Sequence, residues 1–146
     1  YLLFGTGQPD QTGYILGVIS IIRGIRGYDK FDIDKVCKYN DEKVIELQQN
    51  KEIIRNKLKI KASINNSKIF KDIQKEFGSF NNYLKTFTDG KTYYEIDKTT
   101  SPLSDAISKD LQKRGMKFVG STIIYSYLQA IGVIISHDKD CFIFAQ

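Results

Sequence analysis

The most suggestive stretch near the start of the chain is GTGQPDQTGYIL, residues 5–16, which combines three glycines, a proline and several polar residues. Its first residues resemble the glycine fingerprint of dinucleotide-binding folds, but Asp10 occupies the third glycine position and no strand pattern precedes it. A phosphate-binding P-loop needs Lys followed by Ser or Thr after its last glycine, whereas Gly13 is followed by Tyr14. Neither phosphate-loop interpretation fits, so the stretch is better explained as the rim of another kind of pocket.

A second candidate is the pair His137 and Cys141 in SHDKDC, near the other end of the chain. The H-x-x-x-C spacing puts both side chains on one side of a helical turn or tight loop, where they could share a zinc ion. A closed structural site needs four ligands, and Cys37 is the only other thiol, with no second histidine. The alternative is a surface histidine beside a buried cysteine.

A third candidate is a concentration of positive charge. Residues 51–75 contain eight Lys or Arg against two acids. Within LQQNKEIIRNKLKIKA, residues 47–62, two helices joined by a tight hairpin would present backbone amides and a positive helix N-terminus to one phosphate, with Arg55, Lys57 and Lys59 adding charge. The alternatives are a solvated helix face and an ordinary helical hairpin with Ile53 and Ile54 in the core.

The elements that position these residues are predicted to be helices throughout, because helical spacing of apolar residues recurs and strict alternation is rare. The capping signals predict a first helix from Pro9 to about Ile22 and two short helices capped by Asp32 and Asn40. A long helix follows, with one apolar face and an end at Gly78; its expected core residues are Leu58, Ala62, Ile69, Ile73 and Phe77.

The second half of the chain has clearer boundaries. Residues 88–100 have turn chemistry and are predicted to form a loop. Ser101 and Pro102 then begin a helix that ends at Gly115. A final helix from about Ser121 to Ile131 stops at Gly132. The fold class predicted from these signals is all-α, and residues 1–146 are expected to form a single domain.

Composition limits the class of protein. A length of 146 residues fits one domain, and no apolar run is long enough to cross a bilayer. Two distant cysteines and the lack of a signal-peptide pattern favour a reducing compartment, cytoplasmic or nuclear, over secretion. The net charge of +5 favours a polyanionic partner. Because residue 1 is Tyr rather than Met, we expect an N-terminal piece to be missing.

From Phe31 to Phe142 the chain resembles the bacterial-type DNA-3-methyladenine glycosylase I family, a branch of the helix-hairpin-helix glycosylases. EIIRNKLKIKASINNSKIF is similar to the hairpin and second helix of that family, and EFGSFNNYLKTF is similar to its next helix. SPLSDAISKDLQKRGMKFVGSTIIYSYLQAIGVIISHDKDC is similar to its C-terminal signature. The resemblance implies an all-α helical bundle of the helix-hairpin-helix DNA glycosylase type.

The resemblance also implies roles for residues around the base pocket. The first matching family segment reads roughly E-G-x-Q-A-G-L-S-W, and Gln11-Thr12-Gly13 aligns with its Q-A-G. That alignment puts Gln8 at the pocket glutamate, Tyr14 at the leucine that plugs the gap left in DNA, and Leu16 at the tryptophan that stacks on the base. Asp10 is the only acid of this stretch and a possible substitute for the glutamate. The remaining matches to the pocket are Tyr125 and Ser126, at the family's Y-S.

Outside the pocket, the resemblance implies a backbone-binding hairpin and a metal site. The hairpin residues Ile54, Arg55, Lys57 and Lys59 would contact the DNA backbone, although Glu52 replaces the hairpin glycine. His137 and Cys141 match two of the four zinc ligands of the family; a Cys and a His near the family's N-terminus supply the others, so this chain carries half of a zinc site.

The activity implied is hydrolysis of the N-glycosidic bond of alkylated adenine, such as 3-methyladenine, in DNA, which initiates base excision repair. The implied partner is double-stranded DNA containing alkylated bases, bound by a monomer in the cytoplasm, associated with the nucleoid, or in the nucleus, with no role for a membrane. The alternative is a catalytically impaired or inactive homologue that only binds DNA, for which the replaced glutamate and tryptophan are the expected marks.

Overall fold

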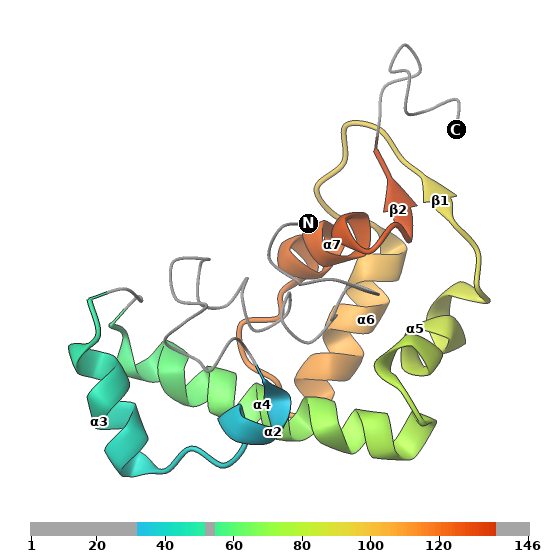
Figure 1. The fold of residues 1–146 in the computed structure, drawn as a ribbon. Coiled ribbons are helices and arrows are strands. Elements are labelled where there is room, and N and C mark those ends of the chain that lie inside the picture. Colours follow the sequence, from blue (N-terminus) through green and yellow to red (C-terminus); the bar gives the residue numbers. More distant parts are fainter. Residues whose placement is uncertain (1–31, 52–54, 137–146) are drawn as a thin grey trace.

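Helices make up almost all of the regular structure in the computed structural model, which describes residues 32–51 and 55–136 (Figure 1). The helices are α2 (Ile33–Val36), α3 (Asp41–Gln49), α4 (Lys57–Phe77), α5 (Phe80–Thr88), α6 (Pro102–Lys113) and α7 (Ser121–Ala130), and the strands are β1 (Tyr93–Tyr94) and β2 (Ile134–Ile135). The all-α prediction is therefore confirmed. The predicted helix from Pro9 to Ile22 lies outside the described residues, and the single-domain prediction, which includes those residues, stays a prediction.

The predicted helix starts are confirmed by side chains that cap exposed backbone amides. Asp32 accepts hydrogen bonds from the first amides of α2, and the Asn40 side chain accepts one from Lys43 N at 2.9 Å at the start of α3. Ser101 and Ser104 bond reciprocally to each other's backbone amides, with Pro102 in the first helical turn of α6. Each cap satisfies amides that have no partner within the helix, which is why these starts could be predicted locally.

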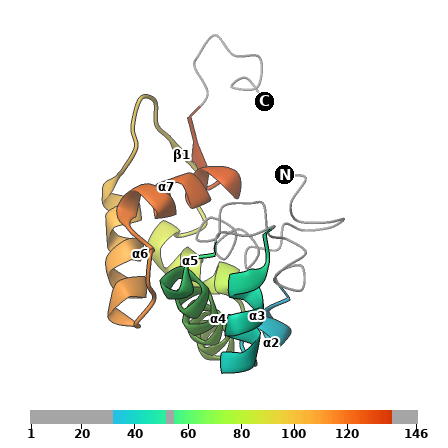
Figure 2. The same ribbon diagram turned by 90° about the vertical axis from the view of Figure 1, so that its left-hand side faces the viewer.

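The long helix α4 organises the fold because it takes part in two hydrophobic clusters. Its first half, through Ile60 and Ile64, packs against residues of α2 and α3, and its second half packs against α5, α6 and α7. Figure 2 looks nearly along α4 and shows α6 and α7 on one side of it and α2 and α3 on the other. Gly78, at a φ of +82°, ends the helix as predicted.

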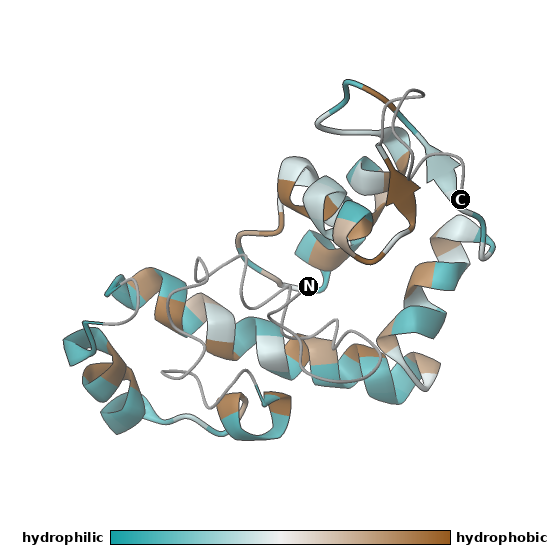
Figure 3. Ribbon diagram, turned by 45° about the horizontal axis from the view of Figure 1, so that its top comes forward, coloured by the Kyte–Doolittle hydropathy of each residue, from teal (hydrophilic) through white to brown (hydrophobic). Residues whose placement is uncertain are grey.

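One part of the α4 prediction is wrong. The helical pattern predicts Leu58 in the core, but 68% of the residue is exposed, whereas Ala62 and Ile73 are buried as the pattern predicts. The first turns of α4 face their cluster with Ile60 and Ile64, which leaves Leu58 on another side of the helix. Figure 3 shows the resulting alternation of hydrophobic and hydrophilic residues along α4.

The larger cluster has an aromatic centre contributed by three helices. The Phe70 and Phe80 rings stack with centroids 4.3 Å apart, and Phe80 also meets Tyr83 and Tyr127 edge-on or tilted at 5.2 Å and 6.2 Å. Such arrangements add to the free energy gained by burying the rings. They fix α5 and α7 against the second half of α4.

The predicted loop at 88–100 is interrupted by a short strand. β1 pairs in parallel with β2, with Tyr93 opposite Ile134 and Tyr94 opposite Ile135. Two residues are too few to show an alternating pattern, and β1 is defined by its pairing with β2, in which Ile134 is buried. None of the helices in the described part of the chain is both long enough and apolar enough to cross a membrane.

Candidate functional site

Most residues of the predicted base pocket and metal site lie outside the described part of the chain. This group comprises Gln8, Asp10, Tyr14, Leu16, His137 and Cys141, and Ile54 of the predicted DNA-backbone contact also lies outside the described part. Within the described residues, no group of three or more His, Cys, Asp or Glu is placed to hold a metal ion. The predicted residues that can be located are the three basic residues of the hairpin and the Tyr125–Ser126 pair.

The start of α4 is held by hydrophobic packing against α3. Val44 and Leu47 of α3 pack with Ile60 and Ile64 of α4, so the hydrophobic contact fixes where α4 begins. At that start Arg55 and Lys57 are exposed, Lys59 is half-buried, and the first helical turn contains no acidic residue. The arrangement presents positive side chains next to the positive end of the helix dipole, which favours an anionic ligand.

The first amides of α4 already have a partner. The Asn56 side chain caps the helix, accepting hydrogen bonds from Leu58 N at 2.9 Å and Lys59 N at 3.3 Å. The prediction that the backbone amides at this helix start would bind a phosphate therefore does not hold for these two amides. A phosphate at this place would be bound by the side chains of Arg55, Lys57 and Lys59. The sequence did contain the signal, since Asn directly before a helical pattern is a strong N-cap.

The connection between α6 and α7, residues 115–119, is clamped to α4 by two asparagines. Buried Asn66 donates from Nδ2 to the Lys117 carbonyl and accepts from Lys117 N at Oδ1, both at 2.8 Å. Asn65 donates to the Gly115 carbonyl at 2.9 Å. The clamp joins α4, which carries the basic residues, to the segment that leads into α7.

Phe118 is presented in an unusual backbone conformation. Its φ is +57°, in the left-handed region that a bulky residue rarely adopts, and the conformation costs on the order of 1–3 kcal/mol. The neighbouring residues hold it there, because Lys117 bonds to Asn66 and the Val119 carbonyl accepts from Ser108 Oγ at 2.7 Å. The Phe118 side chain is nevertheless 40% exposed.

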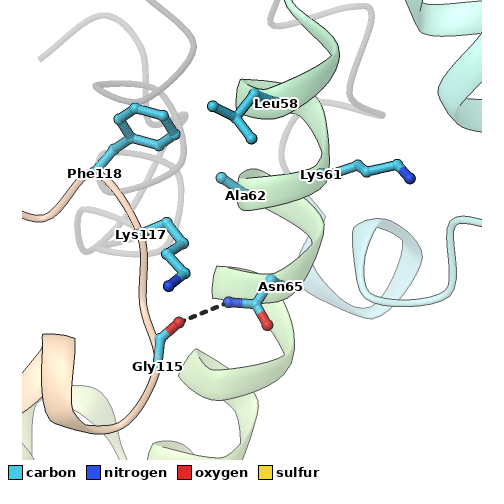
Figure 4. A pocket seen from close by; sticks show the side chains of 7 residues that line it. All are labelled: Leu58, Lys61, Ala62, Asn65, Gly115, Lys117 and Phe118. Atoms are coloured by element: carbon cyan, nitrogen blue, oxygen red, sulfur yellow. Dashed lines mark hydrogen bonds between the residues drawn. The ribbon is translucent and has the colours of Figure 1, made fainter.

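Between α4 and this connection lies a groove of about 440 Å³, shown in Figure 4. Leu58 and Ala62 of α4 face Phe118 across the groove, and Lys117 lies between Phe118 and the Asn65–Gly115 hydrogen bond. Lys61 also lines the groove, with its ammonium directed away from Phe118. Sequence reasoning missed this groove entirely, because its two walls lie far apart in the chain.

The predicted pocket pair on α7 is divided between the two sides of the helix. Tyr125 is buried in the larger cluster, whereas Ser126 is exposed and bonds through Oγ to the Thr122 carbonyl at 3.2 Å. Burial raises the pKa of the Tyr125 hydroxyl; the nearby Glu95 carboxylate raises it further, and Ser136 lowers it. Of the two side chains, only Ser126 lies on the exposed face of α7.

A charged network fastens the ends of α4, α5 and α6 together. Tyr83 Oη donates to Asp110 at 2.7 Å, and Arg114 donates to Asp110 at 2.9 Å and to Glu76 at 2.6 Å. Burial alone would raise the pKa of Asp110, but the hydrogen bonds from Tyr83 and Arg114 outweigh it and lower the pKa. Burial and the bond to Asp110 raise the pKa of Tyr83. The network thus links α4, α5 and α6, the helices that share the larger cluster with α7.

The comparison with protein families decides the identity of this fold. The family model for methyladenine glycosylase matches residues 25–144, which is most of the chain. The chain belongs to the methyladenine glycosylase family. The helical architecture and the family assignment agree, and the resemblance inferred from the sequence is confirmed.

Two curated relatives are similar to the chain over about 120 residues. DNA-3-methyladenine glycosylase 1 of Escherichia coli K12 is 39% identical over 121 residues, which cover 78% of the chain and 64% of the relative. DNA-3-methyladenine glycosylase of Haemophilus influenzae is 28% identical over 120 residues, covering 78% of the chain and 65% of the relative. The chain thus spans slightly less than two thirds of the length of these relatives.

Solved structures of methyladenine glycosylases share the fold. A crystal structure of 3-methyladenine DNA glycosylase I matches with a TM-score of 0.81 and 30% identity, over 94% of this chain and 86% of that one. The Staphylococcus aureus 3-methyladenine DNA glycosylase I, in a study of 3-methyladenine recognition, matches with a TM-score of 0.84 over 92% of this chain and 81% of that one. At 21% identity, the second match shows the fold alone.

Proposed function

We propose that this methyladenine glycosylase-family protein is a DNA repair enzyme that hydrolyses the N-glycosidic bond of alkylated adenine, with 3-methyladenine as the base released. The observation that carries the proposal is the family match over residues 25–144, together with the names of the E. coli and H. influenzae relatives. Its partner would be double-stranded DNA, bound by a monomer in the compartment that holds the DNA, the cytoplasm or the nucleus.

The basic side chains at the start of α4 support DNA as the partner. Arg55, Lys57 and Lys59 extend from one helix start that has no acid in its first turn, and the smaller cluster holds that start in place. Contacts of this kind fix the protein on the DNA backbone without reading sequence. They also make affinity depend on salt, since each neutralised phosphate releases a counterion.

Catalysis would follow extrusion of the damaged base from the duplex, which costs a few kcal/mol and costs least for a damaged base. 3-Methyladenine is positively charged while attached to deoxyribose and is already a good leaving group. The pocket therefore needs mainly to bind the cation and exclude ordinary adenine. We assign Gln8 or Asp10 to the polar edge of the base, Leu16 and Ser126 to the pocket wall, and Tyr14 to the gap in the DNA. Tyr125, which is buried in the larger cluster, would support that wall from the core side.

Zinc binding by His137 and Cys141 is a separate proposal, supported by the match of both residues to the family's zinc ligands. Zinc bound in this way would tie chain segments together and would take no part in the bond cleavage. Two ligands leave half of a tetrahedral shell to other donors. Zinc content measured after purification should fall in the H137A and C141S variants; equal zinc in wild type and variants would remove the proposal.

The second candidate function is DNA binding without catalysis. Gln8 stands where the family has a glutamate, and Leu16 stands where it has a tryptophan. The first change removes a charge that would favour a cationic base. The second forfeits stacking of about 1–3 kcal/mol. Both changes are expected in a relative that has lost activity.

A single-turnover assay separates the two functions. The protein is mixed in excess with duplex DNA containing 3-methyladenine, and the free base is measured over hours at micromolar protein. Release above the uncatalysed rate is expected, and a rate equal to that of DNA alone would contradict the enzyme. A salt titration of binding to undamaged duplex tests the remaining candidate, because salt-independent affinity would remove DNA as the partner.

A further inference from the structure

The groove between α4 and residues 115–118 has the composition of a surface for a single nucleic-acid strand. Its apolar wall is formed by Leu58, 68% exposed, Ala62 and the ring of Phe118, 40% exposed. Apolar side chains that lie next to one another on a surface, rather than scattered singly, are a feature of binding surfaces. The volume of about 440 Å³ lies within the range of small-ligand sites and is too small for a duplex.

The charged side chains around the groove are basic, although the Lys61 ammonium points away from Phe118. The groove lining contains Lys61 and Lys117 and no acid. The Lys59 ammonium lies 6.0 Å from the centroid of the Phe118 ring. Within the described residues, none of these three lysines forms an ion pair, and residues 55–71 contain six Lys or Arg without an acid. An anionic partner is therefore favoured over a neutral or basic one.

The backbone on both sides of Phe118 is held before any partner binds. Asn66 holds both backbone polar groups of Lys117, and Ser108 holds the Val119 carbonyl. The ring is thus presented at the groove by a backbone that cannot easily rotate it away. With the backbone held, only the side-chain torsions of Phe118 have to be ordered on stacking, which lowers the entropic cost of recognising a flat base.

From these observations, we propose that the groove binds an unpaired nucleotide of a DNA strand, outside the base pocket that the family resemblance predicts. The base stacks on Phe118 beside Leu58, and the adjoining phosphates pair with Lys59 and Lys117. The groove begins within the first turns of α4, so a strand contacting Lys57 would continue into it. The proposal rests on the proposed function only in taking DNA as the partner, and it requires no base release.

The test compares binding of a fluorescein-labelled, single-stranded oligothymidylate with binding of an undamaged blunt-ended hairpin duplex, by fluorescence anisotropy at one salt concentration. Phe118→Ala should weaken oligothymidylate binding by about 5-fold to 150-fold, the loss expected for one stacking aromatic. Duplex affinity should be unchanged. Phe118→Tyr, which keeps the aromatic face, should restore the wild-type affinity for the oligothymidylate.

A matched control is Tyr94→Ala, because Tyr94 is also an exposed aromatic, at 62%, but lies on β1. It should leave oligothymidylate binding unchanged. Lys117→Gln should reduce the slope of log affinity against log salt by about 0.7 for a single strand. Thermal unfolding of each variant checks that it is folded. If Phe118→Ala is unstable, Phe118→Tyr still tests the proposal, because a loss of oligothymidylate affinity in this folded variant would contradict stacking on the ring.

Three results would overturn the proposal. The first is equal loss in the Phe118→Ala and Tyr94→Ala variants. The second is parallel loss of duplex and single-strand binding in Phe118→Ala, which would make the groove part of the duplex interface. The third is displacement of the labelled oligothymidylate by oligoglutamate as readily as by unlabelled oligothymidylate. Negative charge alone would then account for binding, with no contribution from base stacking. Base release is measured in a separate assay, so failure of the proposed glycosylase function can be distinguished from failure of the groove proposal.

Discussion

The asparagine clamp on residues 115–119 should be a major contributor to stability. In the Asn66→Ala variant, the Lys117 amide and carbonyl both lose a partner that lies 2.8 Å away. Each lost hydrogen bond costs about 0.5–1.5 kcal/mol, and more when the group left behind is buried, so we expect a loss of about 2–3 kcal/mol in the free energy of unfolding. Against a typical domain stability of about 5–15 kcal/mol, this loss is large.

The neighbouring Asn65 provides a matched control. It lies on the same helix, is exposed, and makes one hydrogen bond, to the Gly115 carbonyl. Asn65→Ala should cost about 0.5–1 kcal/mol. Both variants gain the same helix propensity from alanine, so the difference between them isolates the buried pair of bonds.

The measurement is urea unfolding followed by far-UV circular dichroism, with the unfolding midpoint compared at an unchanged slope. A third variant, Asn66→Asp, keeps the acceptor for Lys117 N and turns the donor into an oxygen that faces the Lys117 carbonyl. Its deficit should shrink as the pH falls and the carboxyl becomes protonated. If Asn66→Ala were no less stable than Asn65→Ala, the clamp could not be what holds residues 115–119 against α4.

Three further predictions concern charge. Lys57→Gln should reduce the salt slope of duplex binding by about 0.9, measured by anisotropy, and an unchanged slope would place the phosphate elsewhere. The pKa values of Glu76 and Asp110 are lowered from 4.5 and 3.8, so their stabilisation is present above these values and is lost as the pH falls through the folded-state pKa values. Urea unfolding should give a lower free energy of unfolding at acidic than at neutral pH, and Asp110→Asn should make this pH dependence weaker. The same pH dependence in wild type and variant would refute the role given to Asp110. Gln8→Glu should raise the single-turnover release of 3-methyladenine, because the carboxylate favours the cationic base; a slower rate would contradict the pocket assignment.

For the described residues, the sequence by itself determined where most of the helices begin and end. Asp32, Asn40 and Ser101 cap helices through bonds to amides two or three residues ahead, and Gly78 ends α4 with a positive φ. These interactions are local, so residue type and spacing are enough to predict them. The long family signature in the second half of the chain likewise sufficed to predict the fold, because it covers several helices together.

Only the tertiary structure decided which faces meet. Leu58 satisfies the helical pattern of a core residue but is exposed, because Ile60 and Ile64 occupy the contact with α2 and α3. The adjacent Tyr125 and Ser126 were predicted together, yet one is buried and the other exposed, because neighbours on a helix point in different directions.

The groove and its clamp had no local signal at all. Asn65 and Asn66 bond to residues 50 and 51 positions further along the chain, and the left-handed conformation of Phe118 depends on those bonds. A residue pattern reports the periodicity of one element, whereas a cavity is made by two elements that chain folding brings together. The sequence therefore predicted the positive charge at the start of α4, and the tertiary structure alone set Phe118 opposite it.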